Sequence, residues 1–379
     1  NRHLINYSNW EPNSVFDVDG CMDESACNYD ESATVDDDSC LYDDCFGECG
    51  GEAVLDECGI CNGPGNLDTW YVDDENGSSD NCGSVDNPLN SIQDAIDLAE
   101  NGDVVYVLGG SYYLSETIEM NKSLDLVCLD EGQCVIAADQ IGRGISITAS
   151  DINIIGFDIS GSDSTEIGIV IRPNTENISI ANNRIYGMAL PHSDVDPFSY
   201  GILVFGESID DMPTNLTFSN NEIWDVTGGA IVLGQYTDSI SIIGNYIHDL
   251  NPVDFLGFPV SYGVGAEFTS NLVVNDNIFE NLYIASNILT SQANIDNNNY
   301  QGVEFLLLST LSEYEFDESI FWYKIQYTIN YNDTDFVGDV YVDDFETAAE
   351  YADDGSVIID SDGNEYLQNC FGEWLESSE

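Results

Sequence analysis

A nine-residue pattern recurs along the middle of this chain. Four copies occupy residues 177–185, 215–223, 239–247 and 271–279, and a weaker copy occupies 151–159. In each copy, apolar residues alternate along one short strand, a polar turn follows, and another apolar residue comes next. A strand that recurs once per coil predicts a solenoid, in which stacked coils bury their apolar faces against one another.

The spacing of equivalent positions gives the length of one coil. Successive equivalent residues lie 26, 38, 24, 32 and 22 positions apart, and they are Phe157, Asn183, Asn221, Asn245, Asn277 and Asn299. A basic coil of about 22–24 residues with insertions accounts for these intervals, so residues 121–310 hold about eight coils. The long intervals contain residues 189–198 and 249–259, both rich in Pro and Asp. We interpret them as protruding loops that meet a partner.

Asn recurs at the turn of each coil. It suits a left-handed backbone, and Asn side chains in successive coils can hydrogen-bond to one another. We therefore predict a structural ladder rather than a set of ligands, formed by Asn183, Asn221, Asn245, Asn277 and Asn299.

The charge is strongly unbalanced. The 379 residues include 71 Asp and Glu but only 6 Lys and Arg, a formal net charge of 6 − 71 = −65. Because 43% of the residues are hydrophobic, the chain is too apolar for a disordered acidic tail. An anionic surface predicts a saline, calcium-containing environment, and it makes nucleic acid and anionic membranes poor partners.

Several features favour an extracellular protein. No apolar stretch is long enough to span a membrane, and the chain begins at Asn1 without a basic and apolar leader, so we expect a processed, secreted chain. Sequons permit N-glycosylation at Asn6, Asn76, Asn121, Asn177, Asn215 and Asn332.

The cysteines allow two interpretations. Zinc would use Cys45, Cys49, Cys58 and Cys61. Disulfides fit better, because the surrounding residues are acidic, no His is nearby and the chain is expected to be secreted. The odd total leaves one thiol free or bridged to another chain. The eleven residues are Cys21, Cys27, Cys40, Cys45, Cys49, Cys58, Cys61, Cys82, Cys128, Cys134 and Cys370.

Residues 20–66 form a Cys-, Asp- and Gly-rich module that is too short and polar for an apolar core. The run from Gly20 to Cys40 resembles a repeat of secreted and surface proteins of marine bacteria and archaea, and the run from Asp44 to Cys61 resembles a Cys/Gly repeat that often follows it. This resemblance implies a stalk or linker. Residues 1–19 form a lead-in that we interpret as a possible assembly strand.

The start of the solenoid has its own signature. Residues 91–100 predict a short amphipathic helix that buries Ile92, Ala95, Ile96 and Ala99, with Ser91 as its N-cap and Asn101-Gly102 at its end. The order of capping helix, Gly-Asp, apolar strand and Gly-x-Tyr resembles the N-terminal cap of pectate-lyase-like right-handed parallel β-helices. The domain then covers residues 67–310, and residues 311–379 form a C-terminal β cap or appendage, with a strand at 321–331 and a helical turn at 345–351.

The resemblance to β-helix enzymes raises the question of catalysis. A calcium-dependent lyase needs a Lys or Arg base, and the candidates are Lys122, Arg143, Arg172, Arg184 and Lys324. The lyase signatures and the paired-Asp and Gly-His-Gly signatures of the hydrolases are absent, and a charge of −65 would repel a polyuronate.

Two His-containing groups allow an acid–base pair or a metal site. One is His248 with Asp249, and the other is His192 with Asp194 and Asp196. With three His in 379 residues, chance placement on loops is the favoured interpretation.

Calcium is the cofactor that the sequence supports best, in a structural role. Acidic clusters beside Gly or Asn turns offer oxygen ligands, although none completes an EF-hand loop. The candidate ligands are Asp17, Asp19, Asp23, Asp36, Asp37, Asp38, Asp73, Asp74, Asp360, Asp362 and Asn364.

Together these features predict an all-β, right-handed parallel β-helix in an extracellular structural or adhesive surface protein. We expect it to be calcium-stabilised, to assemble with copies of itself into a filament or surface layer, and to have no catalytic residue. The alternative is a secreted carbohydrate-active β-helix that cleaves or binds a glycan, which requires a cleft lined by charged and aromatic side chains.

Overall fold

The computed structural model describes most of the chain in two compact units, residues 1–67 and 68–379. The described residues are 17–55, 59, 61, 68–130, 132–191, 197–255, 258–310, 313–316, 322–331, 334–352, 356–368 and 374–377.

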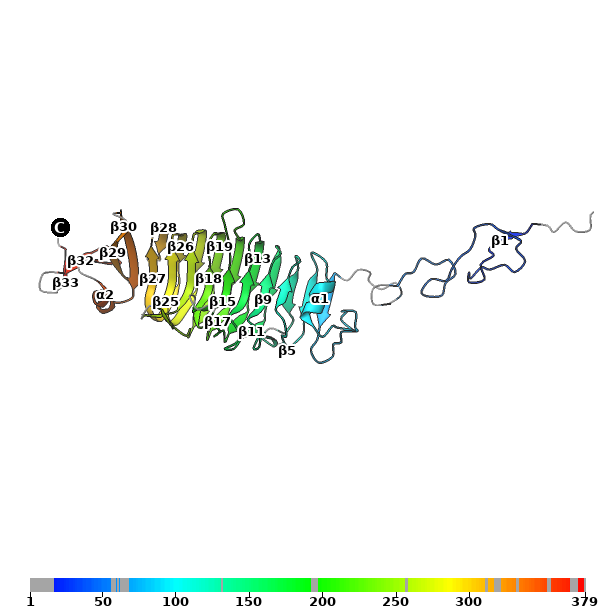
Figure 1. Cartoon of the computed structure of the whole chain (residues 1–379), viewed down its shortest axis with the longest axis horizontal. Helices are drawn as coiled ribbons and strands as arrows, with labels where there is room; N and C mark the ends of the chain where they lie inside the picture. The colour runs from blue at the N-terminus through cyan, green and yellow to red at the C-terminus, as the bar shows by residue number, and fades with distance from the viewer. Residues whose placement is uncertain are drawn as a thin grey trace, which may run out of the picture. The chain divides into compact units, whose positions relative to one another are not determined.

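The second unit is a stack of coils, and Figure 1 shows the strands of successive coils side by side between α1 and β28. One face is a ten-stranded sheet in which all described pairings are parallel. The predicted parallel β-helix is therefore confirmed. In order, the strands are β3 (Thr69–Val72), β4 (Val104–Val107), β7 (Asp125–Cys128), β10 (Ile152–Ile155), β13 (Glu176–Ala181), β16 (Thr214–Ser219), β19 (Thr237–Ile243), β24 (Thr269–Asn275), β26 (Gln292–Asp296) and β28 (Glu313–Phe316).

Two further faces complete each coil. Short strands form the second face, namely β11 (Asp158–Ser160), β14 (Arg184–Tyr186), β17 (Glu222–Trp224), β20 (Tyr246–His248) and the start of β25 (Ile278–Leu289). The third face contains β12 (Ile167–Ile171), β15 (Ser199–Val204), β18 (Gly228–Leu233), β23 (Tyr262–Glu267), the end of β25 and β27 (Asn299–Thr310). The first coils contribute β5 (Gly110–Tyr113), β6 (Ile118–Met120), β8 (Cys134–Ala137) and β9 (Arg143–Ile147).

The core is built from residues that repeat in register. Ile154, Ile180, Phe218 and Ile242 follow one another on adjacent strands of the first sheet, and each is completely buried. Apolar and polar residues alternate along each strand, so the apolar side chains of every coil point inward. This alternation made the repeat recognisable in the sequence.

The Asn ladder lies between the first and second faces. Asn221 accepts hydrogen bonds from the backbone N–H of Asn183 at 3.0 Å and from its Nδ2 at 3.2 Å. Its own Nδ2 donates to the carbonyl of Ile180 at 2.9 Å and to Oδ1 of Asn245 at 3.0 Å. Asn277 repeats this pattern. Each rung thus joins neighbouring coils inside the buried interior.

Two details of the ladder differ from the sequence-based prediction. The fifth rung is Asn298 rather than Asn299, because Asn298 accepts the hydrogen bonds from Asn277 while Asn299 begins β27. The left-handed residue is not the rung itself but the one before it: Asn182, Asn220, Gly244, Asp276 and Asn297. Left-handed backbone turns the chain, so that the next side chain points inward.

The N-terminal end of the stack is closed by α1 (Ile92–Leu98), and the predicted capping helix is confirmed. Ser91 caps it by accepting from the N–H of Asp94, and Ile92, Ala95 and Ile96 are buried. The helix ends at Leu98, before the predicted Asn101-Gly102 stop. Lys122 completes this end, since its Nζ donates to the carbonyls of residues 96, 97 and 99.

The C-terminal residues close the other end within the same compact unit. β30 (Thr334–Val342) pairs antiparallel with β27, which ends parallel stacking there. β29 (Tyr323–Tyr331), β31 (Val357–Asp360), β32 (Glu365–Gln368) and β33 (Trp374–Glu376) extend that sheet, with α2 (Phe345–Tyr351) beside β29 and β30 (Figure 1).

The insertion at residues 249–259 folds back onto the coils. It contains the hairpin β21 (Val253–Phe255) and β22 (Phe258–Val260), and Val253 and Val260 pack against an outer cluster that includes Tyr200 and Leu203. The other insertion contributes Phe198 to this cluster, while its residues 192–196 lie outside the described part. The hairpin and Phe198 therefore cover part of the third face instead of only protruding.

Candidate functional site

The N-terminal unit is held by disulfides. The described pairs are Cys21–Cys40, Cys27–Cys49 and Cys45–Cys61, and the second unit has Cys128–Cys134. Cys82 is also disulfide-bonded, whereas Cys58 and Cys370 lie outside the described residues. The pairings use Cys45, Cys49 and Cys61, so the zinc alternative is wrong.

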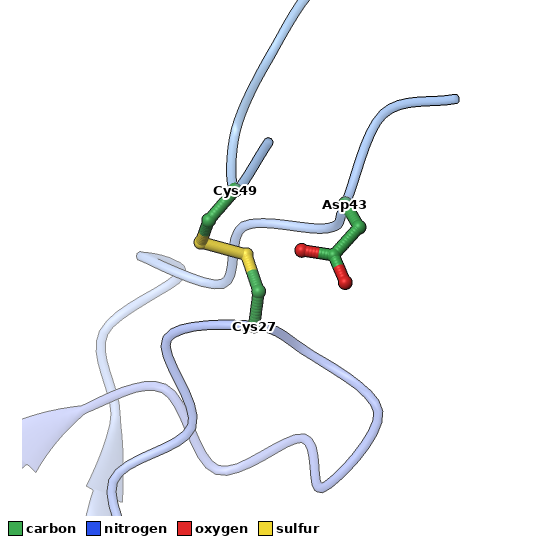
Figure 2. A group of neighbouring side chains, drawn as sticks. All are labelled: Cys27, Asp43 and Cys49. Atoms are coloured by element: carbon green, nitrogen blue, oxygen red, sulfur yellow. A yellow bond between two sulfur atoms is a disulfide. The ribbon is translucent and has the colours of Figure 1, made fainter. Parts of the chain in front are cut away.

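Cys27, Asp43 and Cys49 are the one described group of three or more metal-ligating side chains that lie close together. Figure 2 shows why they do not form a metal centre: the two sulfur atoms are bonded to each other, and only the Asp43 carboxylate is free of that bond. A disulfide has no thiolate to offer a metal.

The predicted calcium ligands mostly serve as turn caps. Asp73 accepts from the backbone N–H of Glu75 and from the backbone and side chain of Asn76, and the latter bond holds the pKa of Asp73 low. Asp360 accepts from the N–H groups of Asp362 and Asn364 and from the Asn364 amide. Asp23, Asp36 and Asp37 cap shorter turns, Asp74 accepts from the N–H of Ser111, and Asp17, Asp19 and Asp38 are exposed.

No three of these carboxylates come together within the described residues. The turns therefore offer scattered carboxylates rather than a preformed calcium site. Calcium binding at these turns stays a prediction.

The second face gathers functional candidates that the sequence left separate. Arg184 forms ion pairs with Asp158 at 2.8 Å and Glu222 at 3.2 Å. His248 lies 2.9 Å from Asp249 through Nδ1 and 3.4 Å from Glu222 through Nε2. The rings of Tyr186, Trp224, His248 and Tyr246 stack along the same strands.

Most groups of this charged and aromatic ladder bind one another, although Asp158 Oδ1 and His248 Nε2 are buried without a hydrogen-bond partner among the described residues. Arg184 lies over the Trp224 ring as well as between two carboxylates, and the ring faces cover one another. Burial raises the pKa of Asp158 against the effect of Arg184. Since its members bind each other, the ladder joins coils and offers few free groups to a ligand.

A sequence signal for this ladder existed. Its members stand one and three positions after successive ladder Asn residues, and the registers Arg184–Glu222 and Tyr186–Trp224 follow from that offset. Of the other cationic residues, Arg143 faces Glu166 at 3.8 Å, Arg172 is half-buried on a coil, and Lys324 is half-buried on β29 of the C-terminal sheet. His192, Asp194 and Asp196 lie outside the described residues.

The ladder makes a prediction about pH. Tyr246 donates to Glu280 at 2.6 Å, and this bond raises the pKa of Tyr246 to about 12. The folded pKa lies above the ordinary value of about 10 for an unfolded tyrosine, so the stabilisation is fully present below pH 10 and is lost as the pH rises through about 12. Absorbance titration of the protein, with Tyr246→Phe for assignment, should show this transition. Glu280→Gln should return it toward 10, and an unchanged Glu280→Gln titration would contradict the assignment.

A groove of about 600 Å³ lies on the third face. Its lining comes from β15, β18, β23 and β25 and from the turns that follow them. Gly265 forms part of its floor, where an added Cβ would lie 2.8 Å from the Tyr262 ring. The lining residues are Tyr200, Leu203, Phe205, Gly206, Glu207, Val232, Leu233, Gly234, Gln235, Tyr262, Gly265, Ala266, Glu267, Asn287 and Leu289.

The groove contains polar groups that no described side chain satisfies. Oδ1 of Asn287 is buried and accepts no hydrogen bond from the described residues. The side chains of Glu207, Gln235 and Glu267 likewise have no partner within the described part of the chain. A concave surface with unpaired polar groups and aromatic walls can bind a ligand, and we take it as the candidate functional site. Sequence reasoning missed it, because its residues stand at unequal spacings in coils of unequal length.

The sequons differ in their surroundings. Asn177 donates to Asp151 at 2.8 Å and accepts from Asn215 at 2.6 Å, and both side chains are exposed at adjacent coil corners. Asn121 is exposed, and Asn6 and Asn332 lie outside the described residues. Among the described helices, none has the length and apolar character needed to cross a membrane.

The fold and its repeats define the class of protein. The model of the family described as the right handed beta helix region matches residues 144–343, and the chain belongs to this family. No curated protein has a detectable sequence match to it.

Several solved structures resemble the chain. A rhamnogalacturonan lyase is 15% identical, with a TM-score of 0.41 over 62% of this chain and 72% of its own. The pectate lyase Pel9A is also 15% identical, with a TM-score of 0.42 over 65% and 77%. The N-terminal fragment of gene product 12 from bacteriophage Phi29 is 18% identical, with a TM-score of 0.43 over 60% and 41%.

Proposed function

We propose that this chain is an extracellular adhesive β-helix that binds a neutral glycan in the groove of the third face. The observation that carries the proposal is the set of unpaired polar side chains there, at Glu207, Gln235, Glu267 and Asn287. On the second face most charged groups pair with one another, although Asp158 Oδ1 and His248 Nε2 are buried without a hydrogen-bond partner among the described residues.

The charge of the groove favours a neutral ligand. None of the five described Lys and Arg side chains lines it. Only 2 of its 15 lining residues are acidic, Glu207 and Glu267, compared with 71 of 379 in the chain. An acidic polysaccharide would meet repulsion without a compensating cation, and a cationic one would find denser carboxylates elsewhere.

The same composition disfavours cleavage by a lyase mechanism. Removing the proton next to a uronate requires a base beside the sugar, and the described cations that could take part lie on other surfaces. The groove instead offers amides and carboxylates that accept from sugar hydroxyls. Rotation of the Asn287 amide toward a hydroxyl would satisfy its buried oxygen, which otherwise costs about 1–3 kcal/mol.

Binding can be measured by calorimetry with cellohexaose, xylohexaose and mannohexaose. We expect one of these neutral hexasaccharides to bind, and Asn287→Leu to weaken it at least tenfold, since this change keeps the size of the side chain but removes its hydrogen bonds. Asn294→Leu, the same change at an exposed position of β26 away from the groove, is the matched control. Absence of binding, or equal effects of both variants, would reject the proposal.

Self-association and calcium binding remain further parts of the proposal. Because α1 closes one end of the coils and β30 pairs beyond the other, we expect copies to meet through side faces or the N-terminal unit rather than by stacking coil on coil. Light scattering with and without millimolar calcium tests both parts.

A further inference from the structure

Two aromatic residues stand at the rim of the groove in a strained backbone conformation. Tyr236 and Phe268 directly follow the lining residues Gln235 and Glu267. Their φ angles are 60° and 52°, and their rings stack with centroids 5.5 Å apart and planes 15° apart. They occupy corresponding corners of adjacent coils, because Thr237 pairs with Thr269.

Large aromatic side chains are out of place at such corners. Of the seventeen described non-glycine residues with positive φ, thirteen are Asn or Asp, and Tyr236 and Phe268 are the only aromatic ones. A left-handed backbone brings Cβ close to the following carbonyl, and a bulky side chain has no polar group with which to offset this crowding. The next corner along the stack holds Thr290 with a φ of 50° and no ring.

Packing does not account for these two residues. Phe268 is 40% exposed and Tyr236 is half-buried, so neither ring fills the core. Phe205, which lines the groove, is 41% exposed. A strained backbone conformation that is not offset by burial of the side chain is characteristic of ligand-binding positions.

We propose that Tyr236 and Phe268, together with Phe205, form a stacking platform for the sugar rings of the glycan. This inference rests on the proposed function of the groove and names the residues that grip the apolar faces of the ligand. Because Tyr236 and Phe268 stack on each other, a sugar meets the outer faces and edges of this pair. Flat apolar faces of pyranose rings pack on aromatic rings, while their hydroxyl edges face the amides and carboxylates of the groove.

The test is the double variant Tyr236→Asn/Phe268→Asn. It relieves two strained turns and loses one exposed stacking contact, so we expect Tm to rise by about 1–3 °C. Affinity for the hexasaccharide that binds the wild-type chain should fall at least tenfold. If the two rings served only to stabilise the fold, the double variant would instead lower Tm.

Thr290→Asn is the matched control, since it relieves the neighbouring corner without removing a ring, and it should raise Tm while leaving affinity unchanged. If the double variant binds as tightly as the wild-type chain, or if its Tm falls, the platform is rejected while the groove proposal stands on Asn287→Leu. If no hexasaccharide binds the wild-type chain, the groove proposal itself fails.

Discussion

Asn221→Ala should lower the free energy of unfolding of the β-helix by about 3–5 kcal/mol, because it leaves two or three buried groups without partners. Asn221 receives hydrogen bonds from the backbone and side chain of Asn183 and donates to the carbonyl of Ile180 and to Asn245. It is 1% exposed, so water cannot replace these bonds. Urea denaturation followed by circular dichroism measures the loss.

Asn294→Ala provides the matched control. Asn294 lies on β26 of the same sheet, but it is exposed and its backbone is not left-handed. We expect its effect to stay within about 0.5 kcal/mol. Similar losses for the two variants would show that the buried ladder is not what holds the coils in register.

Reduction of the disulfides should unfold residues 17–61 while the coils remain folded. Cys21 and Ala26 are the only buried apolar residues described in this unit, so it has almost no core. Its described disulfides join residues 19, 22 and 16 positions apart, and each contributes about 3 kcal/mol by restricting the unfolded chain. Hydrogen exchange with mass spectrometry, with and without reductant, locates the change.

We expect complete exchange in residues 17–55 after reduction and continued protection of buried strands such as β16 and β19. The double variant Cys128→Ala/Cys134→Ala controls for the single described disulfide within the coils, whose residues are 6 positions apart. Protection of residues 17–55 that survives reduction would contradict the prediction. If that protection appears only in millimolar calcium, the ion holds the unit instead.

The repeat was readable because burial imposes a period on the sequence. Each coil must turn a set of apolar residues inward, and Ile154, Ile180, Phe218 and Ile242 therefore recur at matching positions. The error in the fifth rung of the ladder arose at Asn297, Asn298 and Asn299, three identical residues among which the pattern gives no choice. The pairing of Phe279 with Tyr300 decides for Asn298.

The candidate site was not readable in this way. Val232, Gly265 and Asn287 follow one another across the groove, yet they stand 33 and 22 positions apart because an inserted hairpin separates the first two. Nothing in the sequence marks Asn287 as unpaired or Phe268 as strained, since both properties depend on neighbours from other coils.

The nine-residue repeat by itself thus determined the β-helix, its inward residues and the Asn ladder, because each follows from a local period that burial enforces on every coil. The tertiary structure decided which polar groups are satisfied. Arg184 pairs with Glu222, whereas the side-chain oxygen of Asn287 has no hydrogen-bond partner among the described residues. That difference depends on the stacking of coils with unequal insertions, a long-range geometry that no local pattern specifies.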